Sequence, residues 1–369
     1  MHNDGRFDYH NALRYSSDEL AKILSHCFEN YIVRFVLDGP TFAARFGAED
    51  LSLNDSLIVT HRHEPVAVAL IARRGRHSRV AAFSVRPEMR GQGLGKALMQ
   101  RLVADARHRG DRRLSLEVIE GNEAALALYH RAGLRIVRTL TGHQAPAEAP
   151  PGTAALQAVD PLTVSHRLTA EGATDLPWLI APESLFKLPG KPQAYTLNRQ
   201  AYAVVMPGAE HCWLRLIYVP PQHRGQGHAR ALLAALQTRF APLPLTANVF
   251  VPEVAAPFFT HLGWRQDPLR QFEMDMLLDS HKNKTERDND GRKTGKETHP
   301  RRGGRRRAAD VGRLRAAAAH RRPGPATAGG SVGAGGELVP TVRRIPGAGA
   351  SGVQQRAARL RSGQGRAGP

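Results

Sequence analysis

Residues 90–96 read Arg-Gly-Gln-Gly-Leu-Gly-Lys, a composition that suits the binding of a phosphate group by the backbone. An apolar run, 80–85, precedes this segment, and apolar residues at helical spacing follow it. Alternating glycines therefore lie where a strand turns into a helix, and without Cβ atoms they let a ligand approach closely. The first N–H groups of a helix lack internal partners, and the helix dipole adds partial positive charge there. The segment predicts a site for a phosphate or pyrophosphate.

Two common phosphate-binding loops do not fit this segment. A P-loop needs glycine at position 90 and Ser or Thr at position 97, where the chain has Arg90 and Ala97. The dinucleotide-binding fingerprint needs glycine at position 96, which is Lys96. The pattern that remains, Arg-x-x-Gly-x-Gly, recurs as Arg-x-x-Gly-x-Ala at 224–229, again between an apolar run and an amphipathic one. One glycine loop is weak evidence, but its recurrence in the same strand–loop–helix context indicates a repeated structural unit.

The periodicity around both loops predicts an α+β fold, with antiparallel strands first and the glycine loop at a strand–helix–strand crossover. In the first half we expect helices at 16–27, 41–51, 92–108 and 122–131, a hairpin of 56–60 and 66–72, and strands at 80–85, 114–119 and 134–140. In the second half we expect strands at 195–205, 212–219, 245–250 and 272–278 and helices at 226–240 and 254–261. The start of the second half is less clear, because prolines interrupt 176–188.

Composition predicts two domains and a tail. The Pro/Ala/Glu-rich stretch 144–152 indicates a linker, so we expect a first domain at 1–143, a linker at 144–158 and a second domain at 159–280. Residues 281–369 lose all apolar periodicity and are rich in Arg, Gly and Ala, which predicts disorder. This tail holds 21 Lys/Arg and 6 Asp/Glu, and so contributes +15 of the net charge of +19.

The basic tail is the one feature that favours nucleic acid as a partner. Its composition fits an out-of-frame translation of a GC-rich gene better, so we do not expect that partner. Two cysteines without CxxC spacing exclude a disulfide scaffold and a cysteine-rich metal site, and they suit a reducing compartment. The N-terminus lacks a signal-peptide core, and the longest apolar run, 66–72, is too short to span a membrane. We expect a cytoplasmic protein without a metal; the sequence does not indicate its oligomeric state.

Both glycine loops resemble motif A of the GNAT superfamily of acyl-CoA-dependent N-acetyltransferases, Arg/Gln-x-x-Gly-x-Gly/Ala. The family's next elements are a strand and a helix ending in Tyr-x-x-x-Gly-Phe. The first half is similar over 80–135, with a strand through Glu117, then Asn122, Tyr129 and Gly133-Leu134. The second half is similar over 213–264, where Phe259 and Gly263-Trp264 end the helix. The chain thus resembles two GNAT domains in tandem.

The resemblance implies acetyl-CoA as co-substrate and a primary amine of a small molecule or peptide as acceptor. The amine would attack the thioester directly, without an acyl-enzyme, which needs a base for the amine and an acid for the departing thiolate. By the motif, Tyr129 is the acid and Glu117 the candidate base, and Asn122 contacts the cofactor or holds the splayed strands. The pantetheine would pair with a strand edge, and the loop backbone would hold the pyrophosphate. These cofactor-binding positions are Phe83, Ser84, Val85, Arg90, Gly91, Gln92, Gly93, Leu94, Gly95 and Lys96.

Plainer roles remain open for the same residues. Glu117 could be the exposed face of a half-buried strand, Tyr129 could pack against apolar neighbours, and the Arg90 side chain could be structural. The second half places Phe259 at the position of Tyr129 and Ala247 or Asn248 at that of Glu117. We therefore expect it to be catalytically silent or to use Tyr218 or His228. Its possible second cofactor site comprises Val219, Arg224, Gly225, Gln226, Gly227, His228 and Ala229. The alternative function is a non-catalytic acyl-CoA-sensing or protein-interaction module.

Overall fold

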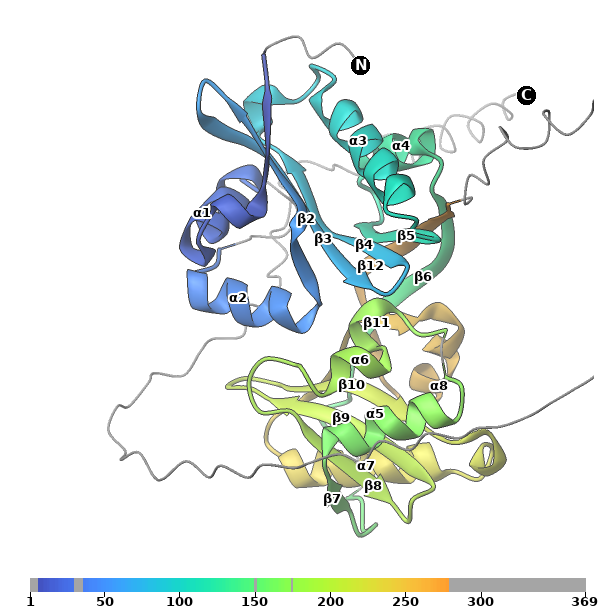
Figure 1. Cartoon of the computed structure of the whole chain (residues 1–369). Helices are drawn as coiled ribbons and strands as arrows, with labels where there is room; N and C mark the ends of the chain where they lie inside the picture. Colours follow the sequence, from blue (N-terminus) through green and yellow to red (C-terminus); the bar gives the residue numbers. More distant parts are fainter. Residues whose placement is uncertain (1–5, 30–35, 149–150, 174, 279–369) are drawn as a thin grey trace, which may run out of the picture. The chain divides into compact units, whose positions relative to one another are not determined.

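The computed structural model describes residues 6–29, 36–148, 151–173 and 175–278. The predicted tail lies outside the described residues. Figure 1 draws the first half in blue to green and the second half in green to orange. By their contacts, all described residues fall within a single compact unit. The boundaries predicted for the domains and the linker stay a prediction.

The first two α-helices of the first half follow a short strand, and a side chain caps each of them. Ser16 caps α1 (Ser17–Cys27) and forms a capping box with Glu19. Asp38 caps α2 (Gly39–Ala48) by accepting from the N–H of Thr41 at 2.8 Å. The second helix starts two residues before the predicted position because proline fits the first turn of a helix. It also ends earlier than predicted.

Strands and two further helices complete the first half. Its first hairpin turns at Arg62 and His63, both at positive φ (50° and 67°), as a two-residue turn between twisted strands requires. Gly133, at φ 101°, ends α4 as predicted. The strands are β1 (Asp8–Asn11), β2 (Leu51–His61), β3 (Glu64–Arg74), β4 (His77–Val85), β5 (Arg113–Ile119) and β6 (Arg135–Gln144), and the helices are α3 (Leu94–His108) and α4 (Glu123–Ala132).

The second half repeats this order but corrects two predictions. A capped helix, α5, fills a stretch for which no element was predicted, and the single strand predicted at 195–205 is a hairpin that turns at Asn198 and Arg199, both at positive φ. The turn was missed because the apolar residues on either side read as one run. The strands are β7 (Gln157–Val159), β8 (Gln193–Leu197), β9 (Ala201–Pro207), β10 (Cys212–Tyr218), β11 (Leu245–Pro252) and β12 (Arg265–Leu277), and the helices are α5 (Pro161–Ala170), α6 (Pro182–Leu185), α7 (His228–Phe240) and α8 (Ala256–His261).

One sheet of twelve strands runs through both halves, in the order β1-β2-β3-β4-β5-β12-β6-β11-β10-β9-β8-β7. The two halves exchange their last strands. β12 does not close the second half, as the sequence suggested, but lies antiparallel between β5 and β6 of the first half. In return, β6 pairs with β11 of the second half. Each half therefore depends on the other for a strand beside its crossover.

Helices cover both faces of the sheet and bury two apolar layers in each half. In the first half, α3 and α4 pack on one face with Leu98, Leu116 and Tyr129, and α1 and α2 pack on the other with Leu24 and Phe46 (Figure 1). In the second half, α7 and α8 cover one face and α5 and α6 the other. Burial of these apolar stripes is the main term that stabilises the sheet.

Candidate functional site

The parallel strands β4 and β5 pair only at their beginnings and then separate. Their register runs from His77 opposite Arg113 to Val80 opposite Leu116. A bulge at Ala81, which has no partner in the β3 register, marks the point of separation. Beyond it, residues 82–85 still pair with β3 but not with β5. One edge of β4 is thus left open to an extended ligand, and it is the predicted edge, 83–85.

The three side chains of this edge point in different directions. Phe83 and Val85 lie toward α3 and α4, where Val85 Cγ2 would be 3.8 Å from a Cβ placed on Gly95. Ser84 is buried on the other face and donates a hydrogen bond to the carbonyl of Cys27 at 2.5 Å. The side chains thus anchor β4 on both faces of the sheet while the backbone edge stays open.

The glycine loop between β4 and α3 takes a conformation that only glycine adopts easily. Gly91 and Gly93 have φ values of 74° and 80°, and a Cβ on either would meet nothing within 4 Å. Positive φ rather than crowding therefore requires these glycines. The guanidinium of Arg90 donates from Nε to the carbonyl of Val85 at 2.9 Å and so closes the loop. This bond fits the structural role considered for the side chain. Gln92 likewise donates to the carbonyl of Glu88, at 3.1 Å.

The N-terminus of α3 has no capping side chain. Among the described helices of ten or more residues, Ser16, Asp38, Asn122 and Asp160 cap α1, α2, α4 and α5. The helices after the two glycine loops, α3 and α7, have glycine as the N-cap residue, so they have no side-chain cap, and their first turns hold no acidic residue. Their first N–H groups and the positive end of the dipole are available to an anion. Lys96 is exposed in the first turn of α3 and adds a positive charge.

The second loop reproduces the first in detail. Gly225 and Gly227 have φ values of 74° and 81°, and Arg224 donates from Nε to the carbonyl of Val219 at 3.0 Å. Gln226 bonds to the carbonyl of Gln222 as Gln92 does to that of Glu88. The strands on either side also separate in the same way, since β10 and β11 pair only from Cys212 to Leu214. Both halves thus present the same backbone arrangement.

Tyr129, the predicted acid, lies in α4 beneath the open edge of β4. The side chain is 6% exposed, and its ring meets that of Phe83 edge to face, with centroids 6.1 Å apart. Asn122 caps the same helix through Oδ1, which accepts from the N–H of Ala125 at 3.3 Å. The cap fixes the start of α4 and hence the position of Tyr129 relative to β4.

Glu117, the predicted base, is held in a network of ion pairs. Arg79 lies between two carboxylates: its Nη2 is 2.7 Å from Oε2 of Glu117, and its Nη1 is 2.7 Å from Oε2 of Glu49. Glu117 is therefore neither a solvated surface charge nor a free base. Because both of its oxygens contact Arg79, a proton acceptor here would have to work from within the pair.

A third carboxylate lies beside Glu117. Glu273 of β12 is its partner in the antiparallel register, so the two side chains share one face of the sheet. Arg138 forms an ion pair with this carboxylate, with Nε 2.7 Å from Oε2. Burial raises the pKa of Glu273, and the negative charge of Glu117 raises it further, while Arg138 opposes the shift. The sequence did not single out Glu273 or Arg79, because their pairing depends on strands far apart in the chain.

The register settles the counterparts of these residues in the second half. Val80 faces Leu116 in the last pair of one crossover, and Leu214 faces Ala247 in the last pair of the other. Asn248, not Ala247, therefore corresponds to Glu117. Gly133 and Gly263 both have positive φ after their helices, which confirms that Phe259 corresponds to Tyr129.

The two alternative groups of the second half are engaged elsewhere. The hydroxyl of Tyr218 donates to Glu171 Oε2 at 2.5 Å, and burial together with this bond raises the pKa of Tyr218 to about 12. His228 lies in the loop, where Nε2 is 3.2 Å from Oε1 of Gln226. Its position suits contact with an anion at the start of α7 rather than proton transfer.

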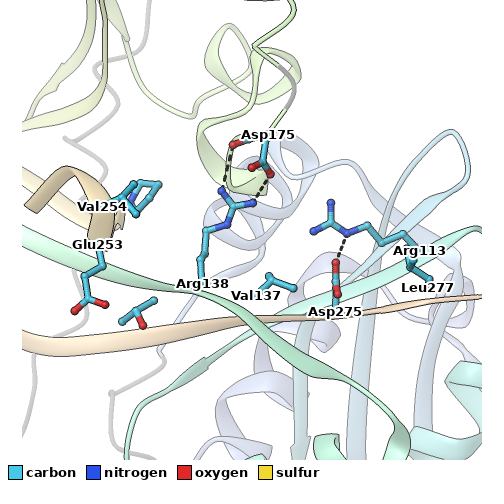
Figure 2. A pocket seen from close by; sticks show the side chains of 10 residues that line it. Arg113, Val137, Arg138, Asp175, Glu253, Val254, Asp275 and Leu277 are labelled. Carbon is cyan, nitrogen blue, oxygen red and sulfur yellow. Dashed lines mark hydrogen bonds and ion pairs between the residues drawn. The ribbon is translucent and has the colours of Figure 1, made fainter.

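A pocket of about 870 Å³ lies on β5, β12 and β6, and none of the predicted site residues lines it. Arg138 pairs there with Asp175 and Arg113 with Asp275, as Figure 2 shows. Arg138 also contacts Glu273, so the pocket borders the carboxylates around Glu117. Ion pairs and the apolar Val137, Val254 and Leu277 line it together.

Within the described residues, no group of three or more His, Cys, Asp and Glu side chains could hold a metal ion. No helix among the same residues is long and apolar enough to cross a membrane.

Comparison with known proteins links this geometry to acetyltransferases. Residues 18–134 match the model of the Acetyltransferase (GNAT) family. A GCN5-related N-acetyltransferase from Sphaerobacter thermophilus has a similar structure, with a TM-score of 0.54 and 19% identity over 74% of this chain and 96% of that one. A tandem GNAT protein from the clavulanic acid biosynthesis pathway gives a TM-score of 0.51 and 15% identity over 74% of this chain and 99% of that one.

A GCN5-related N-acetyltransferase from Kribbella flavida gives a TM-score of 0.51 and 17% identity over 74% of this chain and 71% of that one. At these identities the likeness establishes the GNAT fold alone. No curated protein sequence matches the chain.

Proposed function

We propose that this chain, which has the GNAT fold, is an N-acetyltransferase built from two such units in tandem. It transfers an acetyl group from acetyl-CoA to a primary amine of a small molecule or peptide. One observation carries the proposal: β4 and β5 separate after Leu116, directly beside a glycine loop whose helix starts without a cap. The open edge fits an extended amide chain, and the bare helix start fits a pyrophosphate. Coenzyme A contains both.

The residues of the first loop would bind the cofactor mainly through the backbone. The N–H groups from Gly91 to Lys96 face the pyrophosphate, with the Lys96 ammonium adding charge. The open edge of Phe83, Ser84 and Val85 pairs with the amides of pantetheine. A backbone N–H at the end of this edge polarises the thioester carbonyl, and acetyl-CoA supplies the activated acyl group.

The reaction needs a donor for the departing thiolate and an acceptor for the proton of the amine. Tyr129 lies against Phe83, at the edge where the thioester would lie, and its hydroxyl is the donor. Glu117 takes up the amine proton through a water molecule, held in place by Arg79. The amine attacks directly, without an acyl-enzyme. The acceptor amine would enter from the face of the sheet that α1 and α2 cover, where Glu117 and Glu49 contact Arg79.

The second unit has the glycine loop but lacks the side chains proposed for proton transfer. Phe259 has no proton to donate, and Asn248 cannot act as a carboxylate base. We assign turnover to the first unit, 1–143, and cofactor binding alone to the second, 159–280. We expect the protein to act in the cytoplasm.

The alternative is a module that senses acyl-CoA without turning it over. A panel of amines incubated with acetyl-CoA and the full chain, with release of free thiol as the signal, separates the two functions. Thiol release that depends on one class of amine supports the transferase. Binding of acetyl-CoA without release for any amine supports the sensor.

A further inference from the structure

His143 is a fully buried histidine of β6 that lies against the second unit. Its ring stacks on that of Phe259, with centroids 4.7 Å apart and planes 15° from parallel. Its partner in β11 is Ala247, the last residue that β11 pairs with β10. A strand of the first half therefore places this ring beside the point where the strands of the second half separate.

The same position in the first unit holds a methionine. Leu116 ends the pairing of β5 with β4, and its partner in β12 is Met274. Ala247 ends the equivalent pairing in the second unit, and its partner is His143. His143 thus stands where the first unit has Met274, just as Phe259 stands where it has Tyr129. The polar side chain beside the strand separation is thus Tyr129 on a helix in the first unit and His143 on the exchanged strand in the second.

The hydrogen bonds around Thr141 favour one tautomer of His143. The hydroxyl of Thr141 donates to the carbonyl of Val251 at 3.2 Å, so its oxygen is left to accept. It lies 3.0 Å from Nε2 of His143, to which we assign the ring hydrogen. Nδ1 is then a bare acceptor, and it has no partner among the described residues.

A buried acceptor without a donor is costly, and a ligand that supplies one relieves that cost. Burial also lowers the pKa of His143, so the ring stays neutral at neutral pH. A neutral donor suits it better than a cation.

We propose that the second unit is a binding site for free coenzyme A, in which the thiol donates its hydrogen to Nδ1 of His143. The site rests on the proposed function, because the pyrophosphate is assigned to the loop 224–229. In the first unit the sulfur meets a donor, the hydroxyl of Tyr129, which matches a departing thiolate. In the second it meets an acceptor, which matches a protonated thiol. Acetyl-CoA has no S–H, so this unit selects the unacylated form.

Calorimetric titration of the full chain with coenzyme A, acetyl-CoA and desulfo-coenzyme A tests the site. Gly93→Glu and Gly227→Glu each place a bulky anion in one loop and should prevent ligand binding there. The one ligand molecule that still binds per chain then measures the affinity of the other unit. In Gly93→Glu we expect coenzyme A to bind on the order of fivefold more tightly than acetyl-CoA or desulfo-coenzyme A, the ratio expected for one hydrogen bond. In Gly227→Glu we expect no such preference.

His143→Met introduces the residue type that the first unit has at this position. It should abolish the preference for coenzyme A over acetyl-CoA and desulfo-coenzyme A, while the loop 224–229 still binds all three compounds. The ¹⁵N chemical shifts of the histidine rings can be measured on the wild-type chain, so this test does not depend on the folding of a variant. We expect the signal of Nδ1 of His143 to change on addition of coenzyme A but not of desulfo-coenzyme A. A single equivalent on the wild type, an equal affinity for the three compounds in Gly93→Glu, or an unmoved Nδ1 signal overturns the proposal. Turnover with a single bound equivalent refutes this site alone, whereas two equivalents without turnover of any amine refute the transferase alone.

Discussion

Both carboxylate oxygens of Glu117 contact one guanidinium, with Nε of Arg79 lying 3.1 Å from Oε1 and 2.8 Å from Oε2. The pair bridges β4 and β5 one residue from the point where they separate. Glu117 holds the strands at this point, and its proposed role as a base can be separated from that structural role by comparison with Glu49, the other partner of Arg79.

Glu117→Gln and Glu49→Gln should destabilise the protein alike and differ in turnover. Each leaves Arg79 one carboxylate, so we expect a loss of about 1–3 kcal/mol in the free energy of unfolding. Only Glu117→Gln should lower kcat, by about 100-fold. Denaturant unfolding and steady-state kinetics measure the two effects. An equal fall in kcat for both variants would reduce Glu117 to a structural role.

Tyr129→Phe should lower kcat by about 100-fold or more with little change in the KM for acetyl-CoA, because the ring still packs on Phe83 and only the proton donor is lost. Tyr202→Phe is the matched control. It also removes a buried hydroxyl, bonded to the carbonyl of Arg199, but in the second half. A Tyr129→Phe enzyme as fast as the control would exclude this residue as the acid.

Gly93→Ala and Gly227→Ala impose the same backbone strain on the two loops, since φ is 80° at one and 81° at the other. Each should cost about 1–2 kcal/mol of stability. We expect the KM for acetyl-CoA to rise by about tenfold in Gly93→Ala and to stay unchanged in Gly227→Ala. Thermal unfolding and initial rates test this. Turnover impaired by Gly227→Ala alone would reverse the division of labour.

Stability should fall between pH 7 and pH 5 because of His77. Burial, aided by the charges of Arg113 and Arg74, lowers the pKa of His77 to about 4. The unfolded chain takes up this proton near pH 6.5 and the folded chain does not. The contribution of neutral His77 to the free energy of unfolding is therefore complete above pH 6.5 and is lost as the pH falls toward 4.

We expect a loss of about 1–2 kcal/mol between pH 7 and 5, reduced for partial solvent screening. His77→Gln can keep the bond to Ser115 and should remove this part of the pH dependence in urea unfolding. An unchanged dependence in the variant would assign it to another group.

The strand exchange predicts that neither half folds alone. A fragment of residues 1–158 lacks β12, which lies between β5 and β6, and therefore exposes two strand edges. We expect it to aggregate when expressed alone, and to form a 1:1 complex that turns over acetyl-CoA when co-expressed with 159–369. Size-exclusion chromatography and the thiol assay report both properties. A monomeric, folded 1–158 fragment would contradict the topology.

Local signals in the sequence predicted most elements near the site. The capping residues Ser16 and Asp38, the stop at Gly133 and both glycine loops act through neighbours a few residues away. The hairpin at Asn198 was missed because its apolar flanks hide the turn. The sequence could not predict the partner of Glu117 or the neighbours of His143, since those pairs depend on strands far apart in the chain.

The sequence by itself determined the two glycine loops, the crossover that carries each, and the phenylalanine that stands at the position of Tyr129 in the second half. These depend on backbone dihedrals and periodicity, which neighbouring residues set. Only the tertiary structure decided that β6 and β12 change places, that Arg79 holds Glu117, and that His143 of the first half lies in the second. Strand pairing is selected by the burial of whole apolar faces, and that energy is shared among residues that no local pattern connects.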